Sequence, residues 1–404
     1  MKKTATILAT AMVASLASAG SAIDQLNELG YGTFSGKLQS LSMHRDYETA
    51  DNHSTTLGLQ LDYMSPEKKG WSIGASYIGA GVLASQDYDA VANPGEALIA
   101  NGRNNVLNEA FLQYNMEALG LTNTTAIVGR KVNNGEVFRA NGFRHKERSL
   151  EGIMLDSRDI QDTHLLAGHV WEMSSWQATG DRWKFENFDN AGVDGVTWVE
   201  AVNNSIEGLE VAAFDAVAWD VVNLIGARAK FDLGEEKKTS ILAYLRHEQD
   251  IGQNAGHDAT AFGLSIAQEL GQFSLEGGFF SVAGDNLVFE EGSTGINHAL
   301  GSLMMIYANQ FNGGADTVYL KTTTKVEKTN TKLYGIYSYT QHDEDKLGAT
   351  QRHGQELNIV ATQPIPKIDN LTAALKVGMG YRDGINGEID QLGTDTRLFI
   401  TYKF

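Results

Sequence analysis

The feature that most restricts the fold of this chain is a two-residue alternation of apolar and polar side chains that reaches its last residue. The chain ends in TDTRLFITYKF, where Leu398, Ile400, Tyr402 and Phe404 alternate with mostly polar residues. A period of two places alternate side chains on opposite faces of a β-strand. Most domains end in a frayed polar tail, so this ending predicts a last residue that is held in place beside an apolar neighbour such as lipid.

The same alternation recurs throughout the chain. It is clear in TLGLQLDY (56–63), WSIGASYIG (71–79), EAFLQYNM (109–116) and LTAALKVGMGYR (371–382). With the ending, the segments make about eighteen strands, an even number within the range of bacterial outer-membrane barrels. The other strands, of which 163–173, 194–203 and 331–342 alternate poorly, are expected at 31–43, 123–131, 148–157, 163–173, 194–203, 209–219, 221–232, 239–250, 258–270, 272–283, 315–327, 331–342 and 355–363.

The connections between these strands alternate between short and long. Short ones lie at 65–70, 158–162, 234–238, 270–272 and 328–330. Long ones lie near 84–105, 132–147, 174–193, 284–314, 343–354 and 383–393. Tight periplasmic turns and long external loops give this asymmetry in a transmembrane barrel. We therefore predict an all-β fold, an antiparallel up-and-down transmembrane barrel, in which 284–314 forms either an extra strand or a folded-in loop.

The beginning of the chain predicts export. Lys2 and Lys3 precede a short uncharged apolar run and then small residues, which is the pattern of a cleaved signal peptide. We place the signal at 1–22 and a single barrel domain at 23–404. The terminal Phe404 resembles the export label that the barrel-assembly machinery recognises, and the expected surroundings are outer-membrane lipid and lipopolysaccharide.

Composition excludes several classes of protein. No run of about eighteen apolar residues follows the signal, which excludes a helical membrane protein. The net charge of −18 argues against nucleic acid as a partner. The chain has no Cys, no His-Glu-x-x-His motif and no phosphate loop. We therefore expect no enzymatic activity, no cofactor and no metal.

Alternation also assigns the side chains that face the lumen. Cations fall on the inward parity of several strands, whereas we expect most Asp and Glu to lie in loops and turns. A column of cations in a narrow pore favours anionic groups, although any polar lumen needs polar residues of some kind. The predicted pore-lining basic ladder consists of Arg228, Lys230, Lys321, Lys325, Lys376, Arg382 and Arg397.

One region resembles a known family. The stretch AIVGRKVNNGEVFRANGFRHKERSLEGIMLDSRDI (126–160) resembles the third external loop of the OprD family of porins, with Gly129-Arg130 ending one strand and Glu151-Gly152 opening the next. The resemblance implies substrate-selective channels for small solutes, narrowed by that loop and lined by basic residues. The loop is basic here, so the cations are either part of the constriction or a solvated loop face. The constriction residues that we expect are Arg130, Arg139, Arg144 and Arg148.

These features predict an outer-membrane porin, a monomer or a trimer, that gives passive diffusion of small hydrophilic solutes. Carboxylate-bearing or anionic solutes are favoured by the predicted cations. The alternative is an outer-membrane adhesin or surface-binding barrel that acts through its long external loops, above all 284–314.

Overall fold

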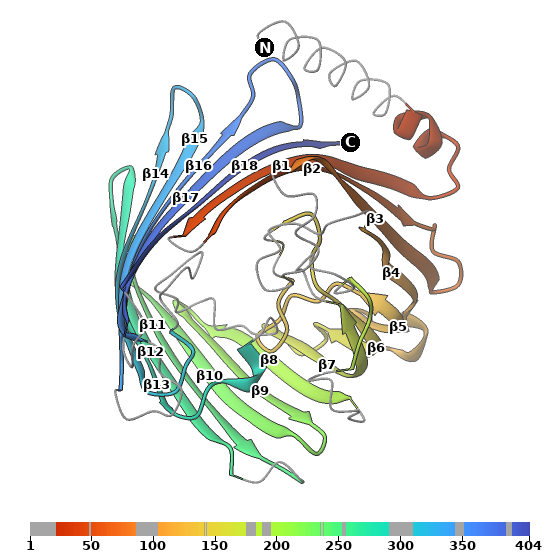
Figure 1. Cartoon of the computed structure of the whole chain (residues 1–404). Helices are drawn as coiled ribbons and strands as arrows, with labels where there is room; N and C mark the ends of the chain where they lie inside the picture. The colour runs from red at the N-terminus through yellow and green to blue at the C-terminus, as the bar shows by residue number, and fades with distance from the viewer. Residues whose placement is uncertain are drawn as a thin grey trace, which may run out of the picture.

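The chain forms one closed sheet of eighteen antiparallel strands (Figure 1). The computed structural model describes residues 22–47, 50–85, 104–140, 142, 144–174, 183–187, 195–234, 236, 238–252, 256–290, 310–343, 351–384 and 390–404. Each strand pairs with its neighbours in sequence, and β1 also pairs with β18, which closes the barrel. The predicted up-and-down barrel is therefore confirmed. The predicted signal peptide lies outside the described residues except for Ala22.

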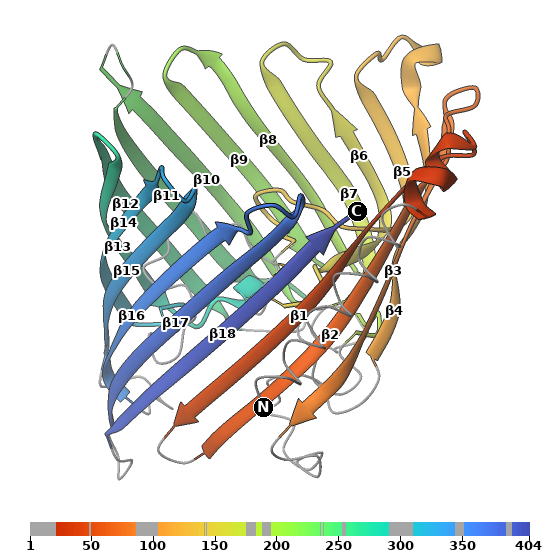
Figure 2. The same ribbon diagram turned by 90° about the horizontal axis from the view of Figure 1, so that it is seen from above.

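The strands are 8 to 15 residues long, and Figure 2 shows them tilted with β1 and β18 side by side. The bounds are β1 Thr33–Tyr47, β2 Ala50–Met64, β3 Trp71–Ser85, β4 Asn104–Asn115, β5 Thr124–Lys131, β6 Ser149–Ser157, β7 Thr163–Ser174, β8 Val196–Ile206, β9 Leu209–Ala218, β10 Val222–Leu233, β11 Thr239–Asp250, β12 Asp258–Leu270, β13 Phe273–Gly284, β14 Ala315–Val326, β15 Thr331–His342, β16 Gln351–Pro364, β17 Leu371–Gly384 and β18 Gln391–Lys403. Two short 3-10 helices, η2 (Met116–Leu119) and η4 (Val288–Glu290), follow β4 and β13, and a short helix at 22–28 precedes β1. None of the helices in the described part of the chain is long and apolar enough to span a membrane.

The two faces of the sheet differ in exposure and chemistry. Large apolar side chains such as Val318, Leu320 and Leu398 are exposed on the outer face. The inner face carries buried residues that touch segments folded into the barrel. Strand β8 alternates poorly because Trp198, on its inner face, is buried in a hydrophobic cluster with Phe138 of such a segment. An inner face that is covered by protein is not restricted to polar residues.

The end of the chain is held by the first strand. The Phe404 amide donates to the Gly36 carbonyl at 3.0 Å, and the Gly36 amide donates to the Phe404 carbonyl at 2.7 Å. A Cβ on Gly36 would overlap the Phe404 ring, so the ring lies directly over this glycine. The last residue thus completes the seam between β1 and β18, as its alternation predicts.

The long connection between β13 and β14 folds inward at both of its described ends. Leu287 and Phe289 follow β13, Phe311 precedes β14, and all three side chains are buried in the inner cluster. The Gly313 amide donates to Asn286 Oδ1 at 2.8 Å, which joins the two ends. The described parts of 284–314 are therefore a folded-in loop, and residues 291–309 lie outside the described part of the chain.

Candidate functional site

The connection between β5 and β6 crosses the inside of the barrel (Figure 1). We call residues 132–148 the bridge; all of them except 141 and 143 are described. One part of the bridge contacts β8 and β10, and another contacts β1 and β2. Because these strands lie on different sides of the ring, the bridge spans the lumen.

The first attachment of the bridge is a wall carboxylate, Glu200 on β8. Its Oε2 accepts the backbone amides of Glu136 and Val137, each at 2.9 Å. Gly135 permits this approach, since a Cβ there would overlap the carboxylate. Next in the chain, Phe138 packs edge-to-face on Trp198 with ring centroids 5.2 Å apart. The Glu200 carboxylate therefore accepts hydrogen bonds from two backbone amides, next to the apolar contact between Phe138 and Trp198.

An ion pair reinforces this attachment. The Glu136 carboxylate accepts Nη2 of Arg228, on β10, at 2.7 Å. Arg228 is only 5% exposed and also pairs through Nη1 with Glu210 on β9, again at 2.7 Å. Arg228 lies on the inner face of β10 and binds the bridge directly.

The second attachment is the His145 imidazole. Its Nε2 lies 2.7 Å from Thr56 Oγ1 on β2, and its ring packs against Gly58 so closely that a Cβ there would overlap it. The Lys37 ammonium, on β1, donates to the His145 carbonyl at 3.5 Å. Burial, with the positive charges of Lys37 and Arg144, lowers the pKa of His145 to about 4. The ring is therefore neutral at physiological pH.

The predicted constriction cations occupy different environments. Arg144 and Arg148 are buried, and Arg148 Nη1 donates to the Arg139 carbonyl at 3.4 Å. Arg139 is partly exposed, and burial lowers the pKa of its guanidinium. Arg130, at the end of β5, pairs with Glu151 and lies 4.0 Å from the centre of the Phe185 ring. Lys146, between Arg144 and Arg148 in the sequence, is fully buried, and its ammonium donates to the Ser174 carbonyl at 3.0 Å.

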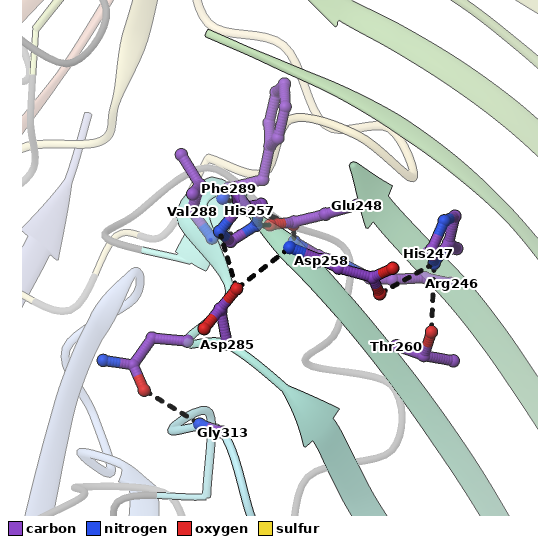
Figure 3. A network of polar contacts seen from close by, with 11 residues as sticks. Arg246, His247, Glu248, His257, Asp258, Thr260, Asp285, Val288, Phe289 and Gly313 are labelled. Atoms are coloured by element: carbon purple, nitrogen blue, oxygen red, sulfur yellow. Dashed lines mark hydrogen bonds and ion pairs between the residues drawn. The ribbon is translucent and has the colours of Figure 1, made fainter. Parts of the chain in front are cut away.

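A second inward segment, residues 285–290, is attached in the same way (Figure 3). Glu248 on β11 accepts the amides of Val288, at 2.6 Å to Oε2, and Phe289, at 3.3 Å to Oε1. Arg246, two residues earlier on the same face of β11, pairs with the Glu248 carboxylate. His257 lies between Glu248 and Asp285, with nitrogen–oxygen distances of 3.6 and 3.9 Å.

One residue of the predicted ladder on the last strands, Arg397, pairs with a buried carboxylate. Asp395 on β18 accepts Nε and Nη2 of Arg397, at 2.9 and 2.7 Å, and Nε of Arg45 on β1, at 2.7 Å. On β17, the Lys376 ammonium lies 5.1 Å from the centre of the inward-facing Phe399 ring. Arg382 is paired in register with Gln391 across the same two strands.

The other ladder residues lie on β10 and β14. Lys230 pairs with Asp232 at 3.0 Å, two residues along the same face. Lys321 pairs with Glu276, its cross-strand neighbour on β13, which also accepts the Tyr319 hydroxyl at 2.9 Å. Lys325 is exposed near the turn that follows β14.

We expected most Asp and Glu to lie in loops and turns, but the inner wall also carries carboxylates that stand on strands. Glu200, Glu248, Glu276 and Asp395 all stand on strands, next to cations or inward amides. Their inward parity was visible in the sequence, as was the inward parity of the basic residues. Two of the cation partners, Arg246 for Glu248 and Arg397 for Asp395, are two residues away on the same strand. The alternation did not reveal the other partners, because these depend on cross-strand register and on folded-in loops.

No protein-family model matches the chain, and no curated protein matches it. Solved structures do match its fold. Pseudomonas aeruginosa OccK9 (OpdG) is 16% identical with a TM-score of 0.75, covering 92% of this chain and 98% of that one. Acinetobacter baumannii OccAB4 is 16% identical with a TM-score of 0.72, covering 92% and 97%. Pseudomonas aeruginosa OpdK, solved with vanillate, is 14% identical with a TM-score of 0.72, covering 92% and 98%. The resemblance inferred from residues 126–160 is thus confirmed for the fold, which is that of the OprD/Occ porins.

Proposed function

We propose that the chain is a passive channel of the bacterial outer membrane for small hydrophilic solutes, with selectivity for carboxylate-bearing ones. The observation that carries this proposal is the bridge, which is attached to opposite parts of the wall of a closed barrel by Glu200 and His145. A barrel with an apolar outer face suits a lipid bilayer. A segment fixed across its lumen narrows the path and brings charged side chains close to any solute that passes.

We further propose that selectivity arises where the path runs between the bridge and the wall of β14 to β18. Lys321, Lys376, Arg382 and Arg397 are borne by that wall, and Arg139 is the predicted bridge cation that keeps partial exposure. A narrow lumen with low-dielectric walls focuses the field of such groups on a solute. The likeness to OpdK, which was solved with vanillate, a carboxylate, agrees with this class of solute.

Conductance of the purified protein in planar bilayers tests the proposal. We expect discrete ohmic steps that decrease when a small permeant carboxylate is added to one side. A Glu200→Gln variant keeps an acceptor oxygen and should conduct in the same way, whereas deletion of 133–147 should widen the pore and enlarge each step. Absence of any conductance from correctly folded protein, judged by its heat-modifiable migration in gels, would contradict the channel function.

A further inference from the structure

Several charges on the inner wall and the bridge occur in sets that pair cations with carboxylates. Each set joins one or two cations to one or two carboxylates through direct contacts between their side chains. Within the described part of the chain, these sets contain six cations and six carboxylates, so their formal charges cancel. The sets are Arg45 and Arg397 with Asp395, Arg228 with Glu136 and Glu210, Lys230 with Asp232, Arg246 with Glu248, and Lys321 with Glu276.

Two of these sets are open to a solute at both charges. The Lys321 and Glu276 side chains are 26% and 13% exposed, and those of Lys230 and Asp232 are 42% and 29% exposed. Both sets lie on the face opposite the exposed apolar residues Leu320 and Phe231. Each presents an ammonium and a carboxylate side by side toward the lumen, so a passing solute meets both charges together.

A simple anion gains little at such a site. Its attraction to the ammonium is opposed by repulsion from a carboxylate only one hydrogen bond away. A solute that carries an ammonium and a carboxylate on neighbouring atoms can place each charge against its opposite. Complementary charge of this kind decides between partners more than it adds raw affinity.

Resting on the proposed channel function, we propose that the preferred solutes are zwitterions with one carboxylate and one ammonium group. The Lys321–Glu276 and Lys230–Asp232 pairs act as the specificity-determining sites. Four of the seven ladder cations, Arg228, Lys230, Lys321 and Arg397, then belong to ion pairs and do not act as isolated positive charges. At the two exposed pairs, a net-neutral solute can match both of its charges.

Swelling of proteoliposomes in isosmotic solutes of similar size tests this. L-Alanine is the zwitterion, L-lactate the anion and glycerol the uncharged reference. We expect alanine to enter about two- to fivefold faster than lactate, the range that one exposed ion pair supplies. Equal or faster entry of lactate would overturn the proposal. Absence of swelling even with glycerol would overturn the proposed channel itself.

Variants locate the effect. Glu276→Gln keeps an acceptor for the Tyr319 hydroxyl but leaves Lys321 without its ion-pair partner, so lactate entry should rise and the alanine preference should be lost. Exchanging the two residues, Glu276→Lys with Lys321→Glu, should restore it. Asp316→Asn, on the outer face of β14, is the matched control and should change nothing. Asp232→Asn repeats the test at the second pair, and an unchanged ratio in both single variants would refute the assignment.

Discussion

The bridge and the second inward segment are attached to the barrel wall by the same kind of contact. In each, a glutamate on the wall accepts two successive backbone amides: Glu200 those of residues 136 and 137, and Glu248 those of residues 288 and 289. A fully buried phenylalanine accompanies each attachment. Phe138 directly follows the second donor residue of the bridge, and Phe289 is itself the second donor of the other segment. A loop inside a water-filled barrel must exchange hydrogen bonds to water for bonds to the wall. A carboxylate under an apolar cover makes that exchange favourable.

The two regions differ in how their charges are balanced. Glu248 is paired with Arg246 of its own strand, and neither side chain is appreciably exposed. In the bridge, the amide acceptor and the ion pair are different groups. Glu200 accepts the two amides, while Arg228 pairs with Glu136 of the bridge itself. The bridge also has a second attachment at His145. We infer that the glutamate attachment of the second segment depends on one buried ion pair, whereas that of the bridge is reinforced by a separate ion pair and by His145.

Replacing each wall glutamate by leucine should give the largest difference. Glu248→Leu removes the partner of a buried arginine, which costs about 3–5 kcal/mol. Glu200→Leu removes acceptors from two amides but leaves Arg228 with both of its carboxylates, and we expect about 1.5–3 kcal/mol. Urea unfolding of the protein in lipid vesicles measures the free energies. Equal losses in the two variants would contradict the difference in charge balance.

The outer face could be predicted from the sequence because its signal is local. Residues such as Val318 and Leu398 alternate with inward residues over a few positions, and lipid requires that pattern wherever the wall is exposed to it. The strand count and the closing role of Phe404 follow from the same signal. The alternation of short and long connections then predicts which end of the barrel faces the periplasm.

The inner contacts that join different strands or loops could not be predicted, because their partners are far apart in sequence. Asp395 and Arg45 are separated by 350 positions, and Glu200 lies 64 positions from its first amide. One local signal was present. Trp198 occupies an inward position of a strand that alternates poorly, and a large apolar side chain there indicates that protein covers the lumen face. Parity places a charge on the inner face but does not say whether a neighbour cancels it.

Acid should release the bridge. The pKa of His145 is about 4 in the folded bridge, below its ordinary value of 6.5. A lowered pKa means that the contact is fully stable above pH 6.5 and weakens as the pH falls toward 4. The full shift corresponds to about 3 kcal/mol. Protease cleavage near 144–148, followed from pH 7.5 to 4, should accelerate in that window. His145→Gln should remove the pH dependence, and an unchanged profile in that variant would contradict the assignment.

A methyl group on β2 should loosen the same attachment without any change of charge. A Cβ at Gly58 would overlap the His145 ring, so Gly58→Ala should displace the imidazole or strain the strand, at about 1–3 kcal/mol. Cleavage of the bridge should accelerate at neutral pH, while the second segment stays protected. Gly335→Ala on β15 is the matched control, since the nearest atom to a Cβ there is 3.6 Å away. Equal effects of the two substitutions would show that steric fit at His145 does not hold the bridge.

The smallest effect should come from the more exposed of the two carboxylates that pair with Arg228. Glu210 is 35% exposed, and exposed ion pairs contribute about 0.2–1 kcal/mol. Glu136 is buried and accepts both Nε and Nη2 of the same guanidinium. Glu210→Gln should therefore lower the free energy of unfolding by less than 1 kcal/mol and leave bridge cleavage unchanged. Glu136→Gln should cost more and loosen the bridge, since it removes the charge of the buried partner and leaves at most one neutral acceptor for Arg228. A double-mutant cycle between Arg228→Gln and each glutamate variant separates the two couplings. A coupling to Glu210 as large as that to Glu136 would mean that the buried pair does not dominate, and that the bridge depends at this end on Glu200 alone.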